Sequence, residues 1–317
     1  MPLIPVSAII PTLDRRDRLV QTLTGVLRQD FVPAEIIVID ASADPIPLAA
    51  LAAVASSSDL APRLHCEAAR VRGAAAQRNQ GSAIASQPFL LYLDNDIDLA
   101  PNCLASLWET MSKNPRVGGC GAMSTNQHYH PPGRFMRSLY RLLGCPAEES
   151  LSGRMCGPAL NFLPAEDGPT KVEWLNLCCT LYRREALPDP PFLAFFSGYS
   201  LMEDAALAWQ VGQRWQLVVP AGARAFHDSR VADYKDRVFR RERMEYVNRW
   251  FVLTRVMGRT AVGWQSRFLL HQLLMLGIPL RRFDGWQRLP AAVAGKVAGL
   301  ITVALHARHW RGYLPRL

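Results

Sequence analysis

The sequence predicts an α/β fold built on a mostly parallel sheet. The first observation is a set of short apolar runs suited to buried strands, at residues 4–11, 36–40, 89–93 and 117–123. The second is that helix-like stretches separate these runs, at residues 15–29, 74–86 and 99–111. Such alternation is typical of βαβ units. The third is size, because 317 residues that are 49% hydrophobic suffice for one sizeable core.

Polar side chains stand where the predicted strands end. Thr12 follows the first strand, Asp40 ends the second, and Asp94 follows the third. Ligands on parallel sheets bind beyond the carboxyl ends of the strands. These three positions therefore indicate where a binding site should lie.

The residue composition and pattern change in the later part of the chain. Residues 124–170 are rich in glycine and proline, which is typical of a surface loop that carries specificity. Regular structure is expected again at residues 172–182, 203–213, 217–219 and 223–226. The pattern beyond residue 228 is helical, with predicted helices at residues 237–256, 268–280 and 289–305.

Positive charge is concentrated in that last segment. The net charge is +9, and residues 228–317 contain 17 Lys and Arg against six Asp and Glu. This excess indicates an anionic partner, which could be lipid headgroups, nucleic acid or a phosphorylated substrate. We therefore expect one domain at residues 1–230 and a helical basic region at residues 231–317.

Cysteine usage and hydropathy indicate which cellular compartment the protein occupies. The seven cysteines are odd in number and lack metal-finger spacing, which predicts reduced thiols in a reducing compartment. Residues 1–10 have no basic region before an apolar stretch, so no secretory signal is expected. Since no window of about 18 residues is both apolar and uncharged, no transmembrane helix is predicted.

The strongest chemical signal is the segment 91–96, LYLDND, in which an apolar strand ends at two carboxylates. Two like charges so close together are unfavourable unless a cation joins them. Hard oxygen ligands suit Mg²⁺ or Mn²⁺, which complete their shells with substrate phosphates. A purely structural interpretation is a solvated turn in which Asp94 and Asp96 precede a helix.

Two further signals are weaker on their own. Glu203 and Asp204 begin a predicted helix, where the helix dipole favours acids, and one of them could instead take a proton from an acceptor hydroxyl. His227 follows a predicted strand, where a lone histidine is usually structural but could be a third metal ligand.

Together these segments follow an order that resembles family 2 glycosyltransferases of the GT-A fold. The similar segments are VSAIIPT at 6–12, IIVID at 36–40, GAAAQRNQG at 73–81, LDND at 93–96, WLNLCC at 174–179 and FSGYSLMEDAAL at 196–207. The resemblance covers about residues 4–230, which would form the catalytic domain. It implies an inverting single displacement from a nucleotide-sugar donor, whose nucleotide could be UDP, dTDP or GDP.

The resemblance also implies roles for individual residues. Asp204 would be the general base with Glu203 beside it, while Trp174 and Glu203 would line the acceptor pocket. The ligands of Mn²⁺ or Mg²⁺ would be Asp94, Asp96 and His227. The donor would contact Pro11, Thr12, Arg15, Asp40, Arg78, Asp94 and Asn95.

Some positions depart from the family pattern. Ala41 follows Asp40 where many members have a second acid, and Ala206 replaces an acid two positions after Asp204. Trp209-Gln210-Val211 stands where an arginine is usual, and Cys178-Cys179 replaces a pair of small residues. The identity of the donor and the contacts of the acceptor therefore stay open.

The basic region at residues 231–317 combines arginines with apolar helical faces. This combination predicts attachment to an anionic membrane surface. The acceptor would then be a lipid-linked saccharide in bacterial surface polysaccharide assembly, on the cytoplasmic side of the membrane. The alternatives are helices that pack on the catalytic domain or form a homodimer. Nucleic acid fits less well, because no recognised nucleic-acid module is visible.

Two other functions have less support in the sequence. A sugar nucleotidyltransferase usually has a glycine-rich phosphate loop after its first strand, and residues 11–15, PTLDR, lack glycine. A non-catalytic scaffold protein with the same fold would be favoured by loss of the acids. The joint presence of Asp94, Asp96, Asp204 and His227 argues against it.

Overall fold

A computed structural model of the chain describes residues 2–56, 62–126, 134–144, 153–156, 159–160, 169–228, 237–277 and 283–313. The chain divides into two compact units. The first consists of Met1–His128 and Leu163–Ser229, and the second of Tyr129–Phe162 and Arg230–Leu317. Residues 129–162 therefore group with the C-terminal segment.

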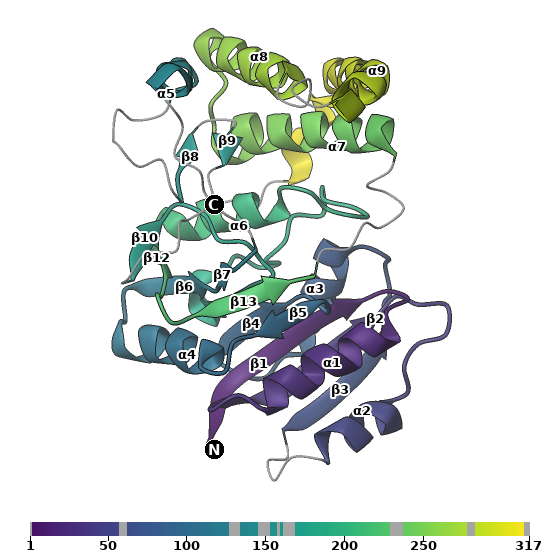
Figure 1. Ribbon diagram of the computed structural model, residues 1–317, viewed down its shortest axis with the longest axis vertical. Helices are drawn as coiled ribbons and strands as arrows, with labels where there is room; N and C mark the ends of the chain where they lie inside the picture. The colour runs from purple at the N-terminus through teal and green to yellow at the C-terminus, as the bar shows by residue number, and fades with distance from the viewer. Residues whose placement is uncertain are drawn as a thin grey trace. The chain divides into compact units, whose positions relative to one another are not determined.

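The first unit is built on an eight-stranded sheet with the order β10-β12-β6-β11-β4-β1-β2-β3 (Figure 1). The strands are β1 Leu3–Thr12, β2 Val32–Asp40, β3 Arg63–Ala68, β4 Phe89–Leu93, β6 Val117–Gly121, β10 Thr170–Val172, β11 Cys179–Arg183 and β12 Gln216–Val219. Strands β4, β1, β2 and β3 pair in parallel, as do β12 and β6. Antiparallel β11 lies between β4 and β6. The predicted mixed, mostly parallel sheet is confirmed.

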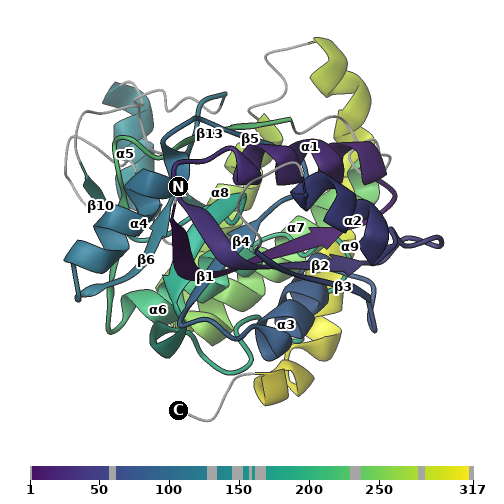
Figure 2. The same cartoon turned by 90° about the horizontal axis from the view of Figure 1, so that it is seen from below.

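Helices cover both faces of this sheet (Figure 2). They are α1 Arg16–Leu27, α2 Leu48–Ala55, α3 Ala74–Ile84, α4 Cys103–Lys113 and α6 Glu203–Gly212, with a short η1 at Arg184–Ala186. Helices α1, α2 and α4 share one core with alternate residues of β1, such as Ala8 and Ile10. On the other face α3 approaches closely, since a Cβ on Gly81 would lie 2.5 Å from Ile9 Cγ2. The alternation of side chains along buried strands explains both layers.

A small second sheet matters for the site. Its order is β5-β13-β7, formed by Ile97–Leu99, Arg224–His227 and Met123–Ser124. Strand β13 pairs antiparallel with β5 so that His227 lies opposite Ile97. The backbone N–H of Asp228 also donates to the carbonyl of Asp96 at 3.0 Å. These bonds bring the end of β13 beside the loop that follows β4.

The second unit is mainly helical. It contains α5 Arg134–Leu142, β8 Met155–Cys156, β9 Ala159–Leu160, α7 Val238–Phe251, the π-helical η2 Val252–Val256, α8 Val262–Gly277, α9 Phe283–His306 and η4 His309–Tyr313. Tyr246, Leu253, Phe268 and Val303 form its core and join α7, η2, α8 and α9. The predicted C-terminal helical extension is therefore present.

The structure adds elements that the sequence did not predict. These elements are α2 at Leu48–Ala55 and β3 at Arg63–Ala68. The sequence pattern missed them because α2 lacks a polar face and β3 is a partly exposed edge strand. Helix α9 continues through Pro290 and begins earlier than expected. Within the described residues, one stretch, Gly285–His306, is long and apolar enough to cross a membrane, although none was predicted. The difference arises because that stretch includes two charged residues, Arg288 and Lys296.

A buried carboxylate ties the first strands together. Glu35 on β2 accepts hydrogen bonds from the Ser7 hydroxyl and from the Ser86 backbone N–H at 2.8 Å, and His65 Nε2 lies 3.2 Å away. Burial acts to raise the pKa of Glu35, but the hydrogen bonds from Ser7 and Ser86 outweigh it and the pKa is lowered. The ionised form therefore stabilises the fold.

We expect Glu35→Gln to lower the free energy of unfolding at neutral pH by about 1–3 kcal/mol, because buried donors lose a charged acceptor. Since the folded-state pKa of Glu35 is lowered, this stabilisation is complete above the unfolded pKa. It is lost as the pH falls through the folded value, so the difference should shrink below roughly pH 4. Urea unfolding at both pH values measures it. Glu109→Gln, at an exposed ion pair with Lys113, is the control and should change little; equal losses in both variants would contradict the assignment.

Candidate active site

The acidic segment lies at the carboxyl edge of the main sheet, as predicted. Strand β4 ends at Leu93, and the N–H of Asp94 donates to the Cys178 carbonyl at 3.0 Å. Asn95 Nδ2 then donates to Thr12 Oγ1 at 2.6 Å, which links the ends of β4 and β1. Thr12 and Asn95 are both buried. The loop after β4 is therefore held firmly where Asp94 and Asp96 leave the sheet.

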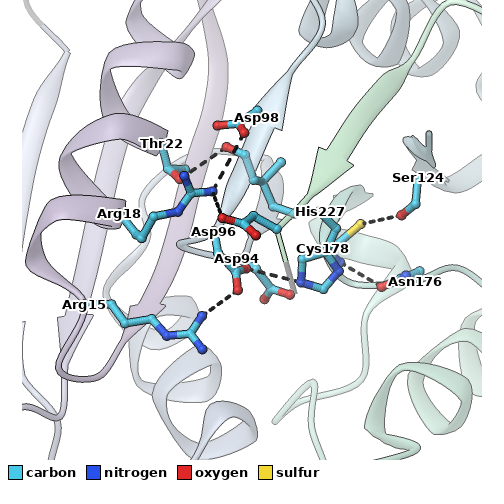
Figure 3. Close-up of polar contacts among 12 residues, drawn as sticks. Arg15, Arg18, Thr22, Asp94, Asp96, Asp98, Ser124, Asn176, Cys178 and His227 are labelled. Carbon is cyan, nitrogen blue, oxygen red and sulfur yellow. Dashed lines mark hydrogen bonds and ion pairs between the residues drawn. The ribbon is translucent and has the colours of Figure 1, made fainter. Parts of the chain in front are cut away.

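Asp94, Asp96 and His227 come together at this edge. One ligand atom from each lies within 4.8 Å of those of the others, and His227 Nε2 is 3.2 Å from Asp96 Oδ1 (Figure 3). Two carboxylates and one imidazole form a mainly hard donor set that suits Mn²⁺ or Mg²⁺. The residues present therefore fit a divalent metal.

Two basic side chains, Arg15 and His227, lie beside the Asp96 carboxylate. Arg15 Nη1 lies 2.5 Å from Asp96 Oδ2, on the side opposite His227. Burial acts to raise the pKa of Asp96, but the hydrogen bond and charge of His227, followed by those of Arg15, lower it. The Arg15 side chain is 34% exposed, so it can turn away toward solvent or toward a phosphate. The position suits an anionic ligand together with a metal.

Arg78 connects Asp94, a candidate metal ligand, to the start of α6. Its Nη2 donates to Asp94 Oδ1 at 2.6 Å, and its Nη1 donates to Glu203 Oε1. The guanidinium is buried and stacks over Phe192, with its central carbon 5.7 Å from the ring centroid. Burial acts to lower the pKa of Arg78, but Glu203 and Asp94 raise it overall, so the charge is permanent.

The segment before α6 has an unusual backbone. Gly198, Ser200 and Met202 have φ values of 63°, 56° and 76°, in the left-handed region. A bridge from Gly73 to Gly198 holds this segment beside α3, and a Cβ on Gly73 would lie 3.0 Å from Gly198 N. Non-glycine residues in this conformation are uncommon and cluster at functional sites. The strain delivers Glu203 and Asp204 to the first turn of α6.

The two acids of α6 are electrostatically unusual. Burial raises the pKa of Glu203 to about 7, against the lowering effect of Arg78. Burial likewise raises the pKa of Asp204 to about 6, although the Ala205 N–H donates to Asp204 Oδ1 at 2.7 Å. Asp204 is the more accessible of the two. A carboxylate with a pKa near neutrality suits general base catalysis.

Three predicted residues have other surroundings. The Asp40 carboxylate accepts hydrogen bonds from the Ser42 N–H and hydroxyl and from the Ile46 N–H, so it shapes the loop after β2. Trp174 is buried in the segment that connects β10 to β11 along the chain, and Pro11 is part of β1. The other predicted positions fall into groups: Asn95 contacts Thr12, Arg15 and His227 contact Asp96, and Asp94 and Glu203 contact Arg78. Asp204 accepts a hydrogen bond from the Ala205 N–H.

The structure also reveals residues that the sequence did not single out as part of the site. Asn126 Nδ2 donates to the His227 carbonyl at 2.8 Å, and its Oδ1 accepts from the His227 N–H at 3.3 Å. Arg18 Nη2 lies 3.4 Å from Asp228 and 3.8 Å from Asp98 (Figure 3). Both hold β13 in place. The sequence offers a clue only for Arg18. It lies nearly one helical turn after Arg15 and so on the same side of a predicted helix.

Comparison with known proteins bears on the family and the fold. The model of glycosyl transferase family 2 matches residues 7–147. No curated protein matches the sequence. A mannosyltransferase, PcManGT from Pyrobaculum calidifontis in complex with GDP-Man and Mn²⁺, has a similar structure, with a TM-score of 0.56 and 18% identity over 98% of this chain and 83% of that one. TarS 1–349 of S. aureus aligns with a TM-score of 0.47 and 15% identity, over 96% and 92% of the two chains.

The described residues have the GT-A glycosyltransferase fold. Residues 7–147 match the model of glycosyl transferase family 2, which confirms over that segment the resemblance predicted from the sequence. The Asp94, Asp96 and His227 group, which could hold a divalent metal, lies where that resemblance implied a metal site.

We expect Asp96→Asn to weaken Mn²⁺ binding by at least the roughly 10–100-fold typical of altered metal sites, because a charged ligand is lost. Isothermal titration calorimetry measures the affinity. The matched control is Asp98→Asn, two residues further along on β5, where the carboxylate faces Arg18 instead of His227. Equal affinities for the two variants would show that Asp96 is no ligand.

Proposed function

We propose that the chain is an inverting hexosyltransferase that moves a sugar from a nucleoside-diphosphate sugar to a hydroxyl acceptor. The observation that carries this proposal is one connected set of charged side chains. It runs from His227 and Asp96 at the metal site, through the neighbouring Asp94, across Arg78 to Glu203 on α6. A donor site and an acceptor site that share a charged link suit direct transfer between two substrates.

In this proposal Asp94, Asp96 and His227 hold Mn²⁺ or Mg²⁺. The ion would neutralise the charge that develops on the diphosphate as the nucleotide leaves. The complex of PcManGT with GDP-Man and Mn²⁺ supports Mn²⁺ and a nucleotide sugar as the molecules that a similar fold binds.

The donor would lie along the carboxyl edge of β1, β2 and β4. Thr12 and Asn95 form a rigid floor there, and Arg15 can reach a phosphate once it leaves Asp96. Asp40 would act indirectly, by holding the loop from Ser42 to Ile46 in a shape that receives the base. The nucleotide would be UDP, dTDP or GDP.

The acceptor would be activated by Asp204. Its carboxylate takes the proton of the acceptor hydroxyl, and the hydroxyl oxygen attacks the anomeric carbon from the side opposite the leaving diphosphate. Glu203 is tied to Arg78 and therefore positions the turn, with Trp174 as part of the acceptor pocket. One displacement of this kind inverts the anomeric configuration.

The acceptor is proposed to be a lipid-linked saccharide in surface polysaccharide assembly, at the cytoplasmic face of the membrane. Residues 1–230 would be the catalytic part, and residues 231–317 would contact an anionic membrane surface or a second copy of the chain. The basic composition of the C-terminal region supports this division.

Nucleotide binding should raise the melting temperature only when a metal is present. With one of UDP, dTDP or GDP at roughly a hundredfold excess over its Kd, and with Mn²⁺, we expect a rise of about 5 °C or more. A thermal-shift panel with and without Mn²⁺, with CMP as the control nucleotide, makes the measurement. Absence of any rise would favour a non-catalytic scaffold protein.

Asp204→Asn should lower the rate of transfer by about 10²–10⁴-fold, because the general base is lost, while the nucleotide-dependent thermal shift is retained. Burial raises the pKa of Asp204 to about 6, so the wild-type rate should fall as the pH drops through that value and protonates the base. Initial rates of nucleotide release across pH test both statements. Asp44→Asn, at an exposed site, is the control, and undiminished turnover in Asp204→Asn would exclude Asp204 as the base.

A further inference from the structure

The outer face of α9 is mainly apolar from Val293 to Leu305. Its exposed hydrophobic residues are Trp286, Val293, Val297, Leu300, Ile301 and Leu305. Spacings of three, four and seven residues place most of them on one side of the helix. None of the Lys, Arg, Asp or Glu residues of α9 shares that side, judged by helical periodicity.

The opposite face of α9 packs closely on α7. A Cβ on Gly295 would lie 2.5 Å from the Phe239 carbonyl oxygen, and one on Gly299 would lie 2.7 Å from Tyr246 Cβ. The charge of Lys296 is satisfied inside this contact, since its Nζ lies 2.9 Å from Glu242 and 3.3 Å from Glu245. The apolar outer face is therefore separate from the packed face.

Helix α8 extends the apolar surface. Val262, Leu269 and Leu273 are exposed and lie on one side at spacings of seven and four residues. The other side of α8 is buried through Phe268, and its Gln272 accepts a hydrogen bond from Lys296 of α9 at 2.8 Å. Figure 1 shows α8 and α9 on the same side of α7.

Exposed arginines border these helices. Those on α7 are Arg237, Arg240, Arg241 and Arg243, and those on α5 are Arg134 and Arg141. Arg243 Nε donates to Thr302 Oγ1 of α9 at 3.2 Å. Gly144, just after α5, meets Trp264 of α8, where a Cβ would lie 2.8 Å from the ring. Positive charge is thus present next to both apolar helices.

We propose that α8 and α9 lie in the plane of an anionic phospholipid membrane, with their outer faces at the boundary of headgroups and acyl chains. Soluble surfaces rarely leave contiguous apolar patches of this kind uncovered, and the arginines select anionic headgroups. This inference rests on the proposed membrane contact of residues 231–317 and deepens it by naming the face and its orientation. It does not depend on the reaction.

The packing of α7 argues against α9 as a transmembrane span. Both helices run in the same direction, because α9 meets α7 first at Gly295 and Phe239 and later where Arg255 Nη2 donates to the Ala307 carbonyl at 2.9 Å. A spanning α9 would carry its neighbour and the exposed arginines of α7 into hydrocarbon, which is strongly unfavourable. Lying in the plane leaves those arginines at the headgroups.

Co-sedimentation of the full chain with phosphatidylcholine vesicles, with and without phosphatidylglycerol, tests the proposal. Binding should require phosphatidylglycerol and weaken with salt, as expected for headgroup contacts. Leu300→Asp combined with Ile301→Asp should reduce partitioning by about tenfold or more, because two apolar side chains leave the membrane. The matched control is Leu48→Asp on α2, since Leu48 and Leu300 are each 48% exposed.

A different binding mode or partner of these helix faces would give different results. Resistance of bound protein to alkaline carbonate would mean a spanning helix and would overturn the proposal. Sedimentation velocity without vesicles tests a second copy of the chain; a dimer that the double variant dissociates, without vesicle binding by either protein, would also overturn it. The same variants are also tested for the Mn²⁺-dependent rise in melting temperature with nucleotide. A variant that keeps this rise is folded and still binds nucleotide. Its loss of vesicle binding is then distinct from any failure of the proposed reaction.

Discussion

The candidate site depends on how one buried arginine compensates the carboxylates that meet at the carboxyl edge of the sheet. Asp94 and Glu203 both contact the guanidinium of Arg78. Burial raises the pKa of Glu203, and the charge of Arg78 acts against that rise. The same guanidinium holds Asp94, a candidate metal ligand, and Glu203 at the start of α6. The proposed donor and acceptor sides of the site are thereby joined through a single side chain.

A second constraint is the small sheet that supports His227. Strand β13 pairs with β5, and Asn126 clamps the backbone of His227 from the side through two hydrogen bonds. Because the loop after β4 leads directly into β5, the same pairing that holds His227 also holds Asp96. Backbone hydrogen bonds therefore hold side by side the segments that carry Asp96 and His227, two of the candidate metal ligands.

The C-terminal unit applies a related principle to a helix surface. Lys296 is buried against Glu242 and Glu245, and small residues at positions 295 and 299 let α7 come close. The central charge of α9 is therefore neutralised on the packed side, which leaves the outer side free of charge. A helix with one charged, buried side and one apolar, exposed side is poorly suited either to water or to crossing a bilayer. It is well suited to the interface between them.

The features that can be predicted from the sequence are those that local pattern encodes. Buried strands at β1, β2 and β4 are short apolar runs, and Asp94, Asp96, Glu203 and Asp204 stand at element boundaries where polar residues signal a site. The tertiary structure decided which of these residues meet. Only folding brings His227 to Asp96 and Arg78 to both Asp94 and Glu203, because long-range pairing leaves no periodic trace in the chain. The same holds for Asp40, whose carboxylate binds its own loop, and for α9, where contact with α7 decides which face is buried.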